Sequence, residues 1–103
     1  MINDESSFKH SGLCALWKDP KKNPPNLNST MIKRCRLLLS HLETATSFKD
    51  IAEGFGETKN FHKLEPSTAQ RYSLDVNGNY RVTFRIVNDK TGEVDGIDLE
   101  DTH

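Results

Sequence analysis

Cysteine, proline and long apolar runs are scarce in this 103-residue sequence, and these scarcities exclude several classes of protein. Two cysteines, Cys14 and Cys35, are too few for a disulfide scaffold or for a zinc site of their own. No apolar run approaches the roughly 20 residues of a membrane span, and the acidic first five residues lack the apolar core of a signal peptide. The sequence therefore predicts a cytoplasmic protein that does not cross a membrane.

Basic residues are also too few for a strongly cationic protein, because the net charge is −1. Their distribution is uneven. Residues 1–46 carry seven Lys or Arg against four carboxylates, whereas residues 86–103 carry one Lys against six carboxylates. A locally basic region suits phosphate contacts, which supply most of the affinity of nucleic-acid-binding proteins. The acidic end has two interpretations at this point, a solvated tail or a functional one.

The length and the aromatic content indicate one small folded domain over residues 1–103. A chain of this size buries only about 60–65% of its unfolded surface, so its core is thin. Five Phe, two Tyr and one Trp nevertheless argue against disorder.

Helical periodicity dominates the first half of the chain. Residues 8–18 are predicted to form a short helix that ends at Asp19-Pro20, and residues 19–29 form a loop rich in Pro and Asn. A longer amphipathic helix over 29–45, capped by Asn28 or Ser29, follows from apolar residues at spacings of three and four. This apolar stripe consists of Met31, Cys35, Leu38, Leu42 and Ala45.

A third, shorter helix is predicted from Ser47 to about Ala52. The segment 47–50 matches a capping box with Asp50 in place of Glu. Gly54 and Gly56 are expected to end this helix.

The period changes to two in the second half of the chain. Short strands are predicted at 61–64 and around Ile97 and Leu99, and longer ones at 72–76 and 80–86. Asn77-Gly78 is typical of a two-residue hairpin turn. Helices followed by antiparallel strands predict an α+β domain, with N-terminal helices packed on a small antiparallel β-sheet.

The predicted hairpin has one polar face. Arg81 and Arg85 lie on that face, and Ser73 and Asp75 should share it. The pattern has two interpretations, a solvated face with an Arg–Asp cross-strand pair or a binding site for an anion.

The C-terminal residues Asp101 and His103 place a carboxylate near an imidazole, the minimum equipment for proton transfer near neutral pH. The surrounding acidic residues have no recognised metal-ligand spacing, so no metal is expected. Cys14 and Cys35 fall on or near apolar helix faces, which favours buried structural thiols.

Five segments resemble, in order, the signatures of the HigB toxins of the RelE/ParE superfamily, also called plasmid maintenance killer proteins. They are SFKHSGL at 7–13, LETATS at 42–47, KLEP at 63–66, YSLDVNGNYRVTF at 72–84 and EDTH at 100–103. Each segment alone is a weak signal, but together they are colinear over essentially the whole chain.

The resemblance implies a RelE-like fold and a ribosome-dependent mRNA endonuclease that needs no metal or cofactor and is neutralised by a helix-turn-helix antitoxin. Such a toxin acts on the ribosome and its mRNA. Arg81 matches the charge-stabilising Arg of the family, and Asp101 and His103 match its proton-transfer or positioning residues. Glu65 aligns with the active-site His of many relatives and completes the predicted catalytic set. Arg71, Arg85 and Ser73 are expected to contact RNA.

Several departures from the family pattern point to a slow or altered nuclease. The Lys-containing stretch of relatives is replaced by residues 67–71, their tail Tyr is Thr102, and the chain lacks their basic net charge. The alternative hypothesis is therefore a catalytically degraded RelE-fold binding module that acts mainly through its antitoxin complex. A stand-alone RNA-binding domain is a third hypothesis.

Overall fold

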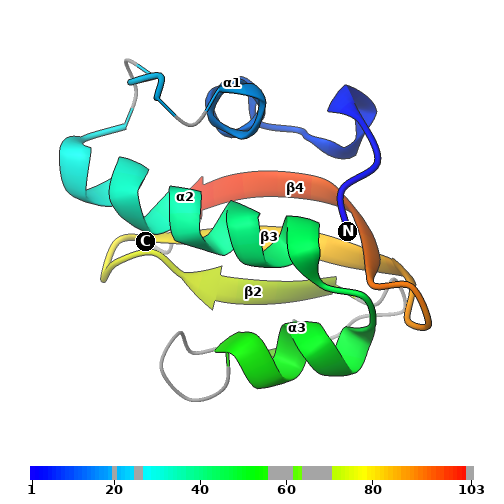
Figure 1. The fold of residues 1–103 in the computed structure, drawn as a ribbon. Helices are drawn as coiled ribbons and strands as arrows, with labels where there is room; N and C mark the ends of the chain where they lie inside the picture. Colours follow the sequence, from blue (N-terminus) through cyan, green and yellow to red (C-terminus); the bar gives the residue numbers. More distant parts are fainter. Residues whose placement is uncertain (20, 25–26, 56–61, 64–70, 102–103) are drawn as a thin grey trace.

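Helices and a β-sheet form two layers in the computed structural model, which describes residues 1–19, 21–24, 27–55, 62–63 and 71–101 (Figure 1). The elements are, in chain order, η1 (Glu5–Ser7), α1 (Ser11–Lys18), α2 (Ser29–Thr44), α3 (Phe48–Phe55), β1 (His62–Lys63), β2 (Arg71–Asp75), β3 (Tyr80–Asn88) and β4 (Glu93–Asp101). This arrangement confirms the predicted α+β class with a RelE-like fold. None of the described helices is long and apolar enough to span a membrane.

The sheet has the strand order β1-β2-β3-β4, and every neighbouring pair is antiparallel. β4 is longer than the sequence predicts, because it pairs with β3 from Asn88↔Glu93 to Tyr80↔Asp101. The pairing of β3 with β4 shifts by one residue between Thr83 and Arg85, which indicates a β-bulge in β4. Gly96 in β4 has a positive φ of 59°, a conformation that a bulge favours. The N-terminal segment runs beside β4 through parallel bridges, which include Phe8↔Ile97.

The first helix is shorter than predicted at its start. Residues 8–10 are extended, because the N–H groups of Lys9 and His10 donate to the carbonyl of Ile97 on β4. His10 instead caps α1, since its Nδ1 accepts a hydrogen bond of 3.1 Å from the N–H of Leu13. A local apolar pattern cannot reveal this pairing with a strand almost 90 residues further along the chain.

The long helix α2 begins and ends nearly where the sequence predicts. Asn28 is the N-cap, and its Oδ1 accepts from the N–H of Met31 at 2.9 Å. One face of α2 is buried, and the helix crosses the sheet in Figure 1. Its Arg34 donates to the carbonyl of Val76 at 2.7 Å, which ties the hairpin loop to the helix layer.

The predicted end of the third helix is wrong, because α3 continues through Gly54 to Phe55. Gly54 allows close helix packing instead, since a Cβ there would lie 1.8 Å from the imidazole of His41 on α2. The predicted capping box is half formed. Ser47 Oγ accepts from the N–H of Asp50, but the Asp50 carboxylate accepts from the backbone and hydroxyl of Thr46, which lowers its pKa. Gly56 lies outside the described residues.

The hairpin between β2 and β3 has a longer loop than the predicted two-residue turn. Asp75 pairs with Arg81, so the loop spans the intervening residues. The Asn77 carboxamide oxygen accepts from the N–H groups of Asn79 and Tyr80, and this side chain organises the turn. Gly78 does not adopt the positive φ that a two-residue Asn-Gly turn requires.

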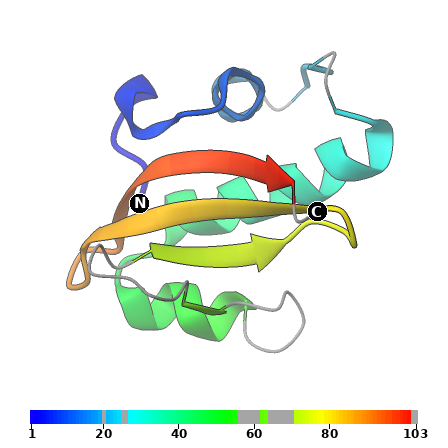
Figure 2. The ribbon, with the colours of Figure 1, turned by 180° about the vertical axis from the view of Figure 1, so that it is seen from behind.

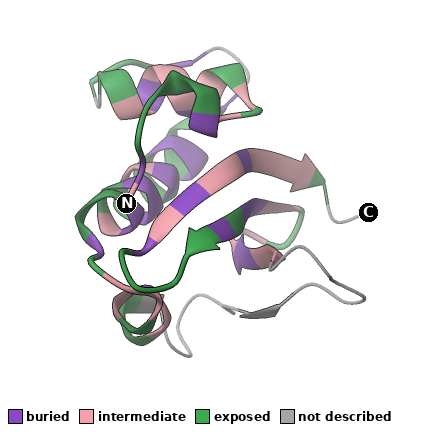
Figure 3. Ribbon diagram, turned by 90° about the vertical axis from the view of Figure 1, so that its right-hand side faces the viewer, coloured by how far each residue is buried: buried purple, intermediate pink, exposed green. Residues whose placement is uncertain are grey.

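The core lies between the helix layer and the sheet, as the burial colours of Figure 3 show. Its fully buried side chains include Leu13 and Leu38 from the helices and Leu74, Phe84 and Ile97 from the strands. Cys35 is buried in the same core, and burial raises the pKa of its thiol to about 11. Cys35 thus fits the predicted structural thiol, and Cys14 is half-buried.

Gly92, in the turn between β3 and β4, combines a positive φ with a close approach to backbone atoms, so its replacement should be costly. Its φ is +73°, and a Cβ there would lie 2.9 Å from the backbone nitrogen of Ser47. We expect Gly92→Ala to lower the free energy of unfolding by about 1–3 kcal/mol, measured by urea denaturation. Gly78→Ala is the matched control, because its Cβ would meet nothing within 4 Å. Equal stability of the two variants would contradict the argument.

Candidate functional site

The sheet face turned away from α2, here called the outer face, carries the predicted site residues. Figure 2 shows β2, β3 and β4 in front of the helices, with this face toward the viewer. The register aligns the polar residues of the three strands in rows, which are Arg71/Arg85/Asp95, Ser73/Thr83/Asp98 and Asp75/Arg81/Glu100. Because directly paired residues point to the same face, the predicted grouping of Ser73, Arg81 and Arg85 is confirmed.

Arg81 is the one outer-face arginine whose side chain makes no hydrogen bond or ion pair with the residues that the structure describes. Its Nε is buried and has no hydrogen-bond partner. Two carboxylates flank it in the register, Asp75 on β2 and Glu100 on β4. A buried donor without a partner costs about 1–3 kcal/mol, so such a group is often kept for a ligand rather than for the fold.

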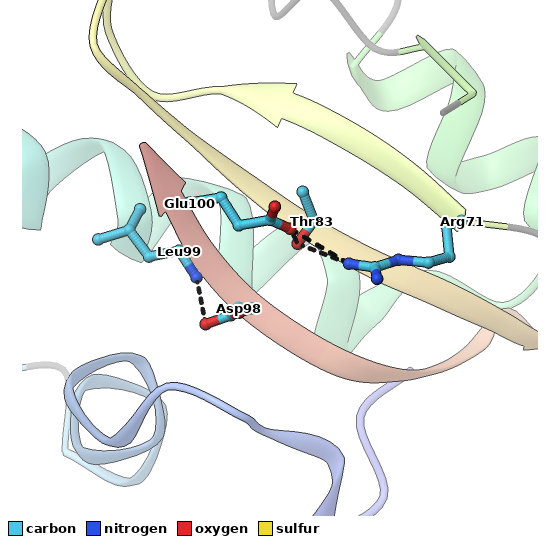
Figure 4. A network of polar contacts seen from close by, with 5 residues as sticks. All are labelled: Arg71, Thr83, Asp98, Leu99 and Glu100. Carbon is cyan, nitrogen blue, oxygen red and sulfur yellow. Dashed lines mark hydrogen bonds and ion pairs between the residues drawn. The ribbon is translucent and has the colours of Figure 1, made fainter. Parts of the chain in front are cut away.

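Glu100 takes part in a small polar network with Thr83 and Arg71 instead of pairing with Arg81 (Figure 4). Its Oε2 lies 3.2 Å from the Nη2 of Arg71 and accepts a short hydrogen bond from the hydroxyl of Thr83. The same Nη2 also donates to the Thr83 oxygen at 3.2 Å. The carboxylate therefore neutralises Arg71 and leaves Arg81 without a counter-charge in this network.

Arg85 also has a carboxylate partner on β4. Its Nε and Nη2 donate to the two oxygens of Asp95 at 2.9 and 2.6 Å, a bidentate pair. These hydrogen bonds raise the pKa of Arg85. A hollow of about 440 Å³ adjoins the pair and is lined by Ser6, Lys9, Arg71, Arg85, Asp95 and Gly96.

The remaining residues of the predicted site are Ser73, Asp101, Glu65 and His103. Ser73 is fully buried on the outer face. Asp101 pairs with Tyr80, which packs against the core, so strand alternation places Asp101 on the opposite face from Arg81. Glu65 and His103 lie outside the described residues.

Sequence reasoning missed four residues of the outer face, which are Thr83 on β3 and Asp95, Asp98 and Glu100 on β4. Thr83 lies two residues from Arg81 and two from Arg85, so the period of a strand already places it on their face. Glu100 could not be placed without the register, because the prediction of β4 was too short to pair it with Arg81. In the described ranges, no group of three or more His, Cys, Asp and Glu side chains is arranged to hold a metal ion.

A comparison with protein families matches residues 6–97 to the model of the RelE-like toxin of the type II toxin-antitoxin system HigB. The fold and this match together define a toxin of a type II toxin–antitoxin system. More particularly, the chain belongs to the HigB-like toxin family. An antitoxin is therefore its partner. A search of curated proteins found no match. The family match ends before Asp98, so Glu100 lies beyond it.

Replacement by Met should destabilise the protein at Arg71 but not at Arg81. Arg81→Met removes a buried donor that has no partner, so we expect the free energy of unfolding to stay equal or rise by up to about 1 kcal/mol. Arg71→Met leaves Glu100 without its ion pair, so we expect a loss of about 1 kcal/mol. Urea denaturation followed by circular dichroism measures both. A larger loss for Arg81→Met would show that Arg81 serves the fold.

Proposed function

We propose that this toxin is a ribosome-dependent mRNA endonuclease, as the resemblance of its sequence motifs implies. The single observation that supports the proposal most is Arg81. Its guanidinium has a buried Nε without a partner among the described residues, on a polar sheet face, while the two neighbouring arginines are paired with carboxylates. An uncompensated guanidinium suits a phosphodiester, because its planar fork can donate two parallel hydrogen bonds.

The proposed reaction is an in-line attack of the ribose 2′-OH on the adjacent phosphorus. The P–O5′ bond breaks as the O2′–P bond forms, and the products are a 2′,3′-cyclic phosphate and a 5′-OH. Arg81 would stabilise the charge that develops on the phosphoryl oxygens. A base must take the 2′-OH proton, and an acid must protonate the leaving oxygen.

Glu65 and His103 are the proposed residues for proton transfer or for positioning the ribose, whereas Asp101 points to the opposite face from Arg81 and does not fit the predicted role beside it. Arg71 and Arg85 are proposed RNA contacts, whereas Ser73 is fully buried and does not fit the predicted RNA contact. Arg71 and Arg85 are each bound to a carboxylate, so each would have to exchange that partner for a phosphate when RNA binds. The proposed partners of the toxin are a helix-turn-helix antitoxin, the ribosome and its mRNA, with no membrane and no cofactor.

A second candidate function is a binding module with degraded catalysis that acts mainly through its antitoxin complex. The observation that favours it is the pairing of Arg71 with Glu100 and of Arg85 with Asp95. These carboxylates offset two positive charges on the face that would meet RNA, and phosphate contacts supply most of the affinity for a nucleic acid.

Primer extension on mRNA in a reconstituted translation reaction separates the two functions. We expect cuts that require ribosomes, that decrease about 10²–10³-fold in Arg81→Ala, and that vanish when His103 is deleted. Lys33→Ala is the matched control, because it removes an exposed charge from α2, away from the outer face. No cuts from the wild-type protein at high excess would favour the binding module.

A further inference from the structure

We propose that Thr83, together with Arg71, holds the Glu100 carboxylate away from Arg81 and so keeps the Arg81 guanidinium open to a phosphate group. The phosphate part of this proposal rests on the proposed function. The conformational part concerns only the side chains of the outer face, so it can be tested by itself. Thr83 is in this view a positioning residue, not a catalytic one.

The register makes an Arg81–Glu100 ion pair the expected arrangement. The two residues are direct partners across β3 and β4, and directly opposed side chains on one face have Cβ atoms about 4.5–5.5 Å apart. Both side chains are long enough to meet over that distance, and opposite charges in such positions attract each other. Yet Arg81 takes no part in the ion pairs of the described residues, and its Nε is unpartnered.

The hydroxyl of Thr83 explains why Glu100 does not pair with Arg81. Thr83 is fully buried, so water cannot easily replace a partner that its hydroxyl loses. It lies one row from Arg81 on the same face of β3 and donates to Oε2 of Glu100. Arg71, on β2, donates to the same oxygen of Glu100. In Figure 4, Thr83 and Arg71 lie on the same side of this carboxylate, so both donors hold it in one position.

Loss of the hydroxyl should therefore release Glu100 toward its direct partner. Glu100 is about one-third exposed, so its side chain can reorient without unpacking the core. An Arg81 that is paired with Glu100 would be a poorer phosphate ligand, because the incoming anion must first displace a carboxylate. The proposal thus predicts that loss of the neutral Thr83 hydroxyl weakens phosphate binding. The cause would be Glu100, which is not itself replaced but pairs with Arg81.

The conformational test uses the ¹H–¹⁵N signal of the Arg81 Nε–H at slightly acidic pH. We expect Thr83→Val, which keeps the shape of the side chain, to shift this signal. The added change Glu100→Gln should return it toward the wild-type position, and Thr83→Ser should leave it near that position because it keeps the hydroxyl. Thr44→Val is the matched control, since its hydroxyl bonds within α2. An unchanged Arg81 signal in Thr83→Val would overturn the proposal.

The binding test uses an RNA oligonucleotide with 2′-O-methyl riboses, which cannot be cleaved. We expect Thr83→Val to weaken binding about 10-fold, the size of one charge-assisted contact, and Thr83→Val/Glu100→Gln to recover most of the loss. Weakened binding without recovery in the double variant would overturn the proposal, because Glu100 would not be the cause. If the wild-type protein does not bind the oligonucleotide, the proposed function fails, while the Arg81 signal still decides whether Thr83 positions Glu100.

Discussion

The pairing of β3 with both of its neighbours is the constraint on which the rest of the structure depends. β3 is hydrogen-bonded to β2 on one side and to β4 on the other, and its side chains alternate between the two faces. Val82, Phe84 and Ile86 therefore enter the core beneath the helices, while Arg81, Thr83 and Arg85 are presented on the outer face. A slip of one residue would exchange these two sets, so the hydrophobic core and the candidate site are specified by the same register.

The helix layer serves the site indirectly, by covering one face of the sheet. The buried stripe of α2 packs over the strands, and the N-terminal segment secures β4 through bridges such as Phe8↔Ile97. Since β4 supplies Asp95 and Glu100, this attachment also positions the carboxylates that pair with arginines. The outer face is thus a polar surface on a firm support, which suits a site that must hold charged groups in place.

Two of the three arginines of the outer face are paired with carboxylates, and Arg81 is not paired among the described residues. Asp95 binds Arg85, and Glu100 binds Arg71, so these two acidic residues of β4 are structural partners of the sheet rather than parts of a solvated tail. For Asp95 and Glu100, the structure therefore excludes the interpretation as a solvated tail. It also relates the low net charge to the site, because carboxylates of β4 compensate two of the arginines of this face.

The sequence by itself determined the α+β class, the extent of α2, the alternation of β3 and the family, because these depend on short-range periodicity and on local motifs. It also placed Ser73, Arg81 and Arg85 on one face. Only the tertiary structure decided where α1 begins, how long β4 is, why Gly54 lies inside α3, and which partner each arginine takes. Those features depend on contacts between residues far apart in the chain, such as Lys9 with Ile97 or Arg71 with Glu100, and a local pattern does not specify the register that brings such residues together.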